Sequence, residues 1–141
     1  MLRSTLACAG LLLLASCAPL SSPSSAPPSQ ACGPGEDTMV NDLLFFGTAM
    51  PGGVVSDDEW KAFLERVVTP RFPAGLTTWP ASGQWRAGNG SLTRESSHVL
   101  ALLHAPDAAS DAAIREIVSQ YKAQFRQESV LRVRAAACVS F

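Results

Sequence analysis

Residues 39–46 read Met-Val-Asn-Asp-Leu-Leu-Phe-Phe and end in four consecutive apolar side chains. Successive side chains of a β-strand point to opposite faces of the sheet. A strand made of this run is therefore apolar on both faces, which is typical of the centre of a sheet. The other elements have to be arranged around this strand.

A helix is predicted next, after the turn signal at residues 50–53. Ser56 and Glu59 have the spacing of a capping box, which marks the start of a helix. From Trp60 onward, apolar residues recur at i, i+3, i+4 and i+7 and form one stripe. We expect Pro70 to end this helix.

A hairpin is predicted in the middle of the chain. Residues 76–86 form a strand that contains Pro80, and a proline cannot donate to a sheet ladder, so this strand belongs at an edge. Residues 87–90 form a turn, and residues 92–104 form a long strand whose second half is apolar.

A second helix and a last strand complete the pattern. Pro106 and Asp107 open an amphipathic helix, with Asp107 or Ser110 as its N-cap. Residues 129–134 then alternate between apolar and polar side chains, as a strand does, and this strand can continue to Val139.

The predicted order of elements is β-α-β-β-α-β, which indicates an α+β, ferredoxin-like fold. In this fold two helices cover one face of a four-stranded antiparallel sheet in the order 4-1-3-2. The order places the Pro80 strand at an edge and the strand at residues 39–46 in the middle. It also makes the first and last strands antiparallel neighbours, so the start of one lies beside the end of the other.

The amino-terminal segment has the features of an export signal. A basic start precedes an apolar run, residues 6–14, that is too short to span a bilayer. The next residues, Leu14-Ala15-Ser16-Cys17, resemble the lipobox of bacterial lipoproteins. The resemblance implies that Cys17 carries a diacylglycerol and that the signal is removed, so that acyl chains anchor the protein to a membrane.

The predicted domain organisation follows from this cleavage site. Residues 1–16 are a lipoprotein signal peptide, residues 17–34 are a Ser/Pro/Ala-rich tether that starts at the lipidated Cys17, and residues 35–141 are a single domain. Since Ala18 follows the cysteine, the resemblance implies anchoring to the outer membrane, facing the periplasm. The alternative is an ordinary signal peptide that is cleaved elsewhere.

The remaining cysteines agree with export. Cys8 leaves with the signal and Cys17 carries lipid, so Cys32 and Cys138 remain as a pair in an oxidising compartment. A disulfide between them is the first expectation, because the predicted strand order brings the two residues together. Two free thiols, or a bridge between two molecules, are the alternatives.

Charge and motifs restrict the function classes. The formal net charge of −1 lacks the basic excess of nucleic-acid-binding proteins, so no nucleic-acid partner is expected. The sequence has no nucleophile elbow and no phosphate-binding loop. We therefore predict no catalytic residue, no metal ligand and no cofactor, and a non-catalytic role is favoured.

The open face of the predicted sheet is the candidate functional surface. The central strands are apolar on both faces while helices cover only one, so something has to cover the second. We expect a second copy of the chain or a periplasmic partner protein there. The alternative is a small-ligand pocket or a cofactor-independent enzyme on the same face, lined by Trp85, Arg94, His98 and Arg132 and suited to an anionic or carbonyl-bearing ligand.

Several segments form a recognisable set: residues 43–47, residues 54–56 with Trp60 and Phe63, and residues 69–76, 83–86 and 127–131. Together they resemble the bacterial exported family known as domain of unknown function 3574. The resemblance covers essentially the whole folded part of the chain. It supports the fold and the export, and it implies no reaction, substrate or catalytic residue.

Overall fold

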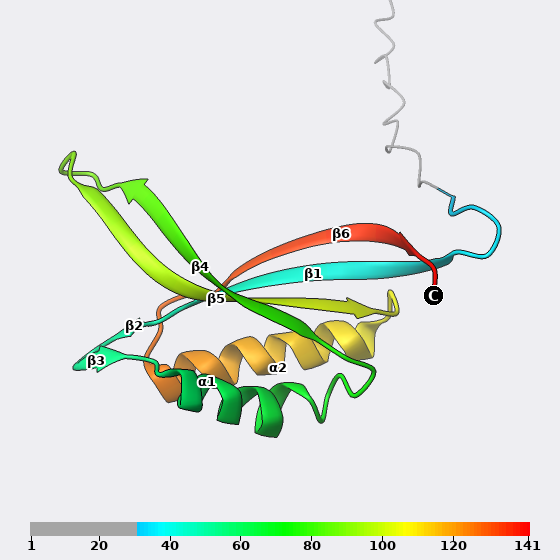
Figure 1. Cartoon of the computed structure of the whole chain (residues 1–141), viewed down its shortest axis with the longest axis horizontal. Coiled ribbons are helices and arrows are strands. Elements are labelled where there is room, and N and C mark those ends of the chain that lie inside the picture. Colours follow the sequence, from blue (N-terminus) through cyan, green and yellow to red (C-terminus); the bar gives the residue numbers. More distant parts are fainter. Residues whose placement is uncertain (1–30) are drawn as a thin grey trace, which may run out of the picture. The chain divides into compact units, whose positions relative to one another are not determined.

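The computed structural model describes residues 31–141, which form an α+β domain (Figure 1). Its four long strands make one antiparallel sheet, and in Figure 1 both helices lie on the same side of it. The strands are β1 (Asp37–Gly47), β4 (Thr77–Arg86), β5 (Leu92–His104) and β6 (Leu131–Val139), and the helices are α1 (Asp57–Phe63) and α2 (Ala108–Phe125). The predicted signal peptide, Cys17 and the tether up to residue 30 lie outside the described residues.

Strand β1 lies inside the sheet, as its apolar run predicts. The order of strands is β4-β5-β1-β6. When the four long strands are numbered along the chain, this is the expected order 4-1-3-2, read from the opposite edge. Strand β4, which contains Pro80, is an edge strand, as the missing N–H group of proline requires.

The strand register divides the side chains between two faces. Leu44 of β1 lies opposite Leu100 of β5 and Arg132 of β6, and Leu100 lies opposite Thr78 of β4. Side chains of residues that lie opposite each other point to the same face of the sheet. In this sheet even-numbered residues pair with even-numbered ones and odd-numbered with odd-numbered ones, so the residue number tells which face a side chain is on. Even-numbered residues of the four long strands form the helix face, and odd-numbered residues form the open face.

The core fills the space between the helix face and the two helices. Its largest fully buried side chains include Phe46 of β1, Phe63 of α1 and Tyr121 of α2. The rings of Phe46 and Tyr121 are 4.6 Å apart between centroids and meet edge to face. Burial of each such side chain stabilises the fold by about 1.5–3 kcal/mol. No helix within residues 31–141 has the length and apolar character that a membrane span requires.

Helix α1 begins at the predicted capping box. The Ser56 hydroxyl accepts the N–H of Glu59 at 3.3 Å, and the Glu59 carboxylate accepts the N–H of Ser56 at 2.8 Å. The regular α-helix ends at Phe63, and one π-helical turn (Leu64–Val68) carries the chain on toward Pro70. The helical segment therefore stops where the proline predicts, but its last turn is wider than an α-helix.

Helix α2 has a clear cap at each end. Asp107, one of the two candidates, is the N-cap, because its carboxylate accepts the N–H of Ser110 at 2.7 Å. The helix ends at Phe125, and Arg126 has a φ of 53°, in the left-handed region. A left-handed residue after the last turn is a common helix ending, although glycine or asparagine usually occupies it.

Two features of the strands differ from the predictions. Strands β2 (Ala49–Met50) and β3 (Gly53–Val54) pair as a short hairpin, where the sequence indicated only a turn. Strands β4 and β5 also continue past the end of β1, since Gly47 pairs with Ser97 and residues 92–95 of β5 pair only with β4. Figure 1 shows this pair projecting away from the helices. We call residues 82–95 the arm.

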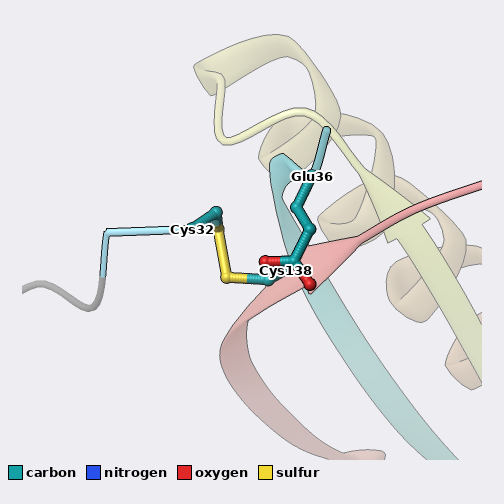
Figure 2. Close-up of side chains that lie close together, drawn as sticks. All are labelled: Cys32, Glu36 and Cys138. Atoms are coloured by element: carbon teal, nitrogen blue, oxygen red, sulfur yellow. A yellow bond between two sulfur atoms is a disulfide. The ribbon is translucent and has the colours of Figure 1, made fainter. Parts of the chain in front are cut away.

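A disulfide joins Cys32 and Cys138, as the strand order predicts (Figure 2). Thr38 of β1 lies opposite Cys138 of β6, so the start of β1 is next to the end of β6, and the two cysteine Cα atoms are 5.4 Å apart. The Glu36 carboxylate lies within 4.8 Å of the two sulfur atoms. The sulfurs are bonded to each other, and Glu36 accepts the N–H of Gly33 at 2.8 Å, so the group is a structural clasp.

Candidate functional site

The four residues predicted to line the open face do not share one face. Arg94 and His98 of β5 and Arg132 of β6 are even-numbered and lie on the helix face, and only Trp85 of β4 lies on the open face. The prediction of one open-face site built from all four residues is therefore wrong. The physical reason is the pleat: Trp85 is an odd number of positions away from Pro80, the partner of His98, so the two side chains point to opposite sides.

His98 is a packing residue of the core. Only 8% of it is exposed, and its ring stacks on Trp60 with centroids 4.7 Å apart and planes 5° apart. Burial lowers the pKa of His98 below its usual value of 6.5, and the carboxylate of Asp57 offsets part of this effect. The neutral ring therefore packs as an aromatic group near pH 7.

Arg132 binds a buried carboxylate. Asp42 of β1 is fully buried and accepts two hydrogen bonds from Arg132, one from Nε to Oδ1 and one from Nη2 to Oδ2, both 2.7 Å long. The Nε2 atom of His104 lies 2.8 Å from Asp42 Oδ2. Burial by itself raises the pKa of Asp42, but the hydrogen bonds from Arg132 and His104 hold it below its usual value of 3.8. The carboxylate is ionised and paired.

Asp111 extends this group to helix α2. Arg132 Nη1 donates to Asp111 Oδ1 at 2.7 Å, and Arg134 Nη1 donates to the same oxygen at 3.3 Å. The hydrogen bond from Arg132 is the main cause that lowers the pKa of Asp111. Hydrogen bonds to Asp42 and Asp111 in turn raise the pKa of Arg132. We call Asp42, His104, Asp111 and Arg132 the buried charge cluster.

The buried charge cluster holds the fold together. It links β1, β5 and β6 to α2, and each of its two carboxylates accepts at least two hydrogen bonds. The residues of the cluster point at one another, and none of the cavities described below is lined by them. Sequence reasoning missed Asp42, although an aspartate inside a central apolar strand is a signal that a cation is buried with it.

The open face carries apolar side chains on all four strands and also four polar uncharged residues, namely Asn41, Thr77, Thr93 and Ser97. Of the odd-numbered residues in the long strands, only Asp37 and Glu95 carry a charge, and they lie at opposite ends of the sheet. Large apolar side chains on this face are 42–60% exposed, namely Trp79, Leu103, Leu131 and Val133. A hollow of about 490 Å³ lies at one end of the face, lined by Met39, Leu103 and Phe141 among others.

A cleft of about 580 Å³ lies at the base of the arm. We call it the arm cleft. Three segments line it: Trp85 and residues 93–95 of the arm, residues 49–51 around β2, and residues 126–129 between α2 and β6. Two of the four predicted residues, Trp85 and Arg94, both line this cavity. The cavity is open there because β1 ends opposite Ser97, so residues 92–95 of β5 have no neighbouring strand on that side.

A smaller hollow of about 250 Å³ adjoins the arm cleft on the open face. Phe45, Gly47 and Gly83 line it, and Glu95 and Ser129 line both cavities. Sequence reasoning missed Glu95 and the residues after α2 as cleft residues. Only the three-dimensional arrangement brings them together, since they lie on different elements.

The family described as "Protein of unknown function (DUF3574)" matches residues 41–141. The chain belongs to this family. The family match confirms the resemblance that the separate sequence segments indicated, over residues 41–141. No curated protein matches the sequence.

Solved structures similar to the DUF3574 domain share its fold at low sequence identity. A phage SAM lyase in complex with S-methyl-5'-thioadenosine matches with a TM-score of 0.53 at 12% identity, over 82% of this chain and 97% of the lyase chain. CutA from Synechococcus elongatus PCC7942 matches with a TM-score of 0.52 at 14% identity, over 74% of this chain and 83% of the CutA chain. At these identities the similarity concerns the fold alone.

Three segments that carry the resemblance to the DUF3574 family meet around the arm cleft. Residues 43–47 contribute Phe45 and Gly47, and residues 83–86 contribute Gly83 and Trp85. Residues 127–131 contribute their first three residues to the arm cleft. These segments are far apart in the sequence, so the cleft and its adjoining hollow are the place in the domain where they come together.

Proposed function

We propose that this protein is an exported, lipid-anchored envelope protein whose ferredoxin-like domain acts without catalysis, by pairing with a second copy through the open face. The observation that carries the proposal is the apolar character of that face over all four strands. The membrane anchor rests on the sequence around Cys17, and the disulfide between Cys32 and Cys138 fits an oxidising compartment outside the cytoplasm.

The anchor gives the first testable prediction. We expect Cys17→Ser to move the chain from the membrane fraction of the envelope to the soluble fraction, because without the thiol no diacylglycerol can be attached. Metabolic labelling with radioactive palmitate should mark the wild-type chain and not the variant. Cys8→Ser, which changes a cysteine within the predicted signal, is the matched control and should keep both label and membrane location.

Two results would contradict the anchor. Palmitate label on the Cys17→Ser chain would place the lipid elsewhere. A wild-type chain found free in the periplasm, without label, would support an ordinary signal peptide.

The occupant of the open face is best explained as a second copy. Exposed leucine, valine and tryptophan side chains on this face favour an equally apolar partner surface, and a two-fold pair presents the same surface from both sides. The two charged residues, Asp37 and Glu95, lie at the ends of the face, where a pair can leave them in solvent. Anchoring to one membrane surface also raises the effective concentration of copies.

The size of the face fits such a pair. Four strands of about nine residues, at about 3.3 Å per residue and about 4.8 Å between strands, cover roughly 600 Å². A standard protein–protein interface buries roughly 800 Å² per partner. The face therefore supplies most of the area that a specific pair needs.

Self-association gives the second prediction. We expect Leu103→Glu to weaken pairing by at least about 30-fold, because it puts a charge into an apolar interface. Leu92→Glu is a matched control: Leu92 lies on the same strand and is exposed to a similar extent, 47% against 43%, but it is even-numbered and points away from the open face. Sedimentation velocity over a range of concentrations measures both.

The pairing hypothesis fails in either of two cases. The wild-type chain stays monomeric at every concentration tested, or Leu92→Glu dissociates the pair as strongly as Leu103→Glu does.

A further inference from the structure

Two hydrogen-bond acceptors, one from Glu95 and one from Gln127, border the space beside Gly47, where the arm cleft meets the smaller hollow. A methyl group added at Gly47 would overlap with Oε1 of Glu95 and would lie 3.2 Å from Oε1 of Gln127. Both oxygens border this space because Gly47 has no side chain to fill it. Within residues 31–141, no donor hydrogen-bonds the carboxylate of Glu95.

The orientation of the Gln127 amide is set by its other contacts. Its Nε2 donates to the carbonyl oxygen of Ala49 at 2.6 Å and also contacts that of Phe125 at 3.4 Å. Both partners are acceptors, so the nitrogen has to face them, and Oε1 is left at the space beside Gly47. A carboxylate oxygen and an amide oxygen that border the same space can both accept from one donor with several N–H groups, such as an ammonium group.

The charges along the cleft also select the ligand. Glu95 and Glu128 are negative and Arg94 and Arg126 are positive, so the four charges that line the cleft cancel. Arg126 makes no ion pair within the described residues, and its guanidinium can hold a carboxylate through two parallel hydrogen bonds. A cleft with free groups of both signs suits a ligand that carries both signs.

Trp85 adds an apolar surface at the same place. The side chain is 48% exposed and lines the cleft, so a ring or an aliphatic group of a ligand can pack against it. The volume of about 580 Å³ is that of a small-molecule site.

We propose that the arm cleft binds a small zwitterion of the α-amino-acid type. Its ammonium group donates to Glu95 and to Gln127 Oε1, its carboxylate pairs with Arg126, and its side chain packs on Trp85. The site lies at the arm end of the open face, where Trp85 and Glu95 belong to that face, and it needs only residues of one chain.

The test is calorimetric titration of the purified full chain with glycine, L-leucine and L-phenylalanine. We expect saturable binding of at least one of them. Phenethylamine lacks the carboxylate of L-phenylalanine, and 3-phenylpropanoate lacks its ammonium group. Each should bind at least about tenfold more weakly than L-phenylalanine, since a charge-assisted hydrogen bond is worth roughly 1.5–3 kcal/mol and 1.4 kcal/mol is a factor of ten.

Variants assign the two ends of the ligand. Glu95→Gln should weaken amino-acid binding at least about tenfold and should leave the affinity for 3-phenylpropanoate unchanged. Arg126→Asn should do the reverse, sparing phenethylamine, and asparagine is well suited to the left-handed backbone at this position. Gly47→Ala should weaken binding without any change of charge, because its methyl group occupies the space beside Gly47 and moves the Glu95 carboxylate.

Glu65→Gln, an exposed change outside the cleft, is the control and should bind like the wild type. The proposal is overturned if none of the three amino acids binds at millimolar concentration. It is also overturned if phenethylamine binds as tightly as L-phenylalanine, or if Glu95→Gln binds amino acids like the wild type while circular dichroism shows the native fold.

Discussion

Replacement of Asp42 by asparagine is expected to lower the free energy of unfolding by about 3 kcal/mol. The change removes the charge of a fully buried carboxylate and leaves the guanidinium of Arg132 and the ring of His104 facing a neutral amide. Loss of one partner from a buried ion pair is costly because the remaining charge keeps its desolvation penalty. Urea denaturation followed by circular dichroism measures the effect.

The matched control is Asp58→Asn. Asp58 also pairs with a cation, Lys61, at 3.5 Å, but its side chain is 96% exposed. Exposed pairs contribute about 0–1 kcal/mol, so this variant should unfold close to the wild type. A loss below about 1 kcal/mol for Asp42→Asn would mean that the buried charge cluster adds little to stability.

The same cluster makes stability depend on pH. The pKa of Asp42 is lower in the folded chain than its usual value of 3.8, so the unfolded chain binds a proton more readily. The stabilisation by Asp42 is therefore complete above the usual value and is lost as the pH falls through the lowered one. We expect the stability of the wild type to fall more steeply with acid than that of Asp42→Asn.

Removal of the disulfide is the second change with a large expected effect. The bond between Cys32 and Cys138 closes a loop with a sequence separation of 106 residues. In the chain-entropy model a loop of about 100 residues contributes up to about 4.7 kcal/mol, and loss of a native disulfide typically costs 2–5 kcal/mol. We expect the Cys32→Ser, Cys138→Ser double variant to lose free energy of unfolding in this range.

A reductant provides the control for the double variant. Dithiothreitol should lower the denaturation midpoint of the wild type toward that of the double variant, and it should leave the double variant unchanged. Equal midpoints for wild type and double variant without reductant would show that the bond does not stabilise the native state.

The arrangement of strands could be predicted because each strand carries its own evidence. The apolar run ending at Phe46 requires a central position, and Pro80 requires an edge. The order 4-1-3-2 satisfies both and also brings Cys32 to Cys138. The short hairpin of β2 and β3 was missed because two-residue strands around Pro51 and Gly52 leave no periodic pattern.

The faces of the sheet could not be predicted with the same success. Alternation shows that Leu131 and Val133 share one face and that Arg132 and Arg134 share the other, but it does not show which face meets the helices. Arginine is usually exposed and leucine usually buried, but in β6 the arrangement is the opposite. Hydrogen bonds to Asp42 and Asp111 favour Arg132 on the helix face, so Leu131 and Val133 lie on the open face and are exposed to solvent.

The arm cleft was beyond sequence reasoning for a different reason. Its acceptor pair needs a glycine at the end of β1, a glutamate on β5 and a glutamine after α2. Taken alone, the glycine is typical of a turn, the glutamate of a surface charge and the glutamine of a helix cap. Only the register of β1 against β5, together with the left-handed turn at Arg126, places them at one point.

The position of the disulfide has a mechanical consequence. Without the disulfide, a pulling force on the chain ahead of Cys32 would act on the first hydrogen bonds of β1 and break them one after another. The covalent link passes this load directly to Cys138, so β1 and β6 are pulled as one unit. A domain held by its amino-terminal end can thus resist drag without losing its central strand.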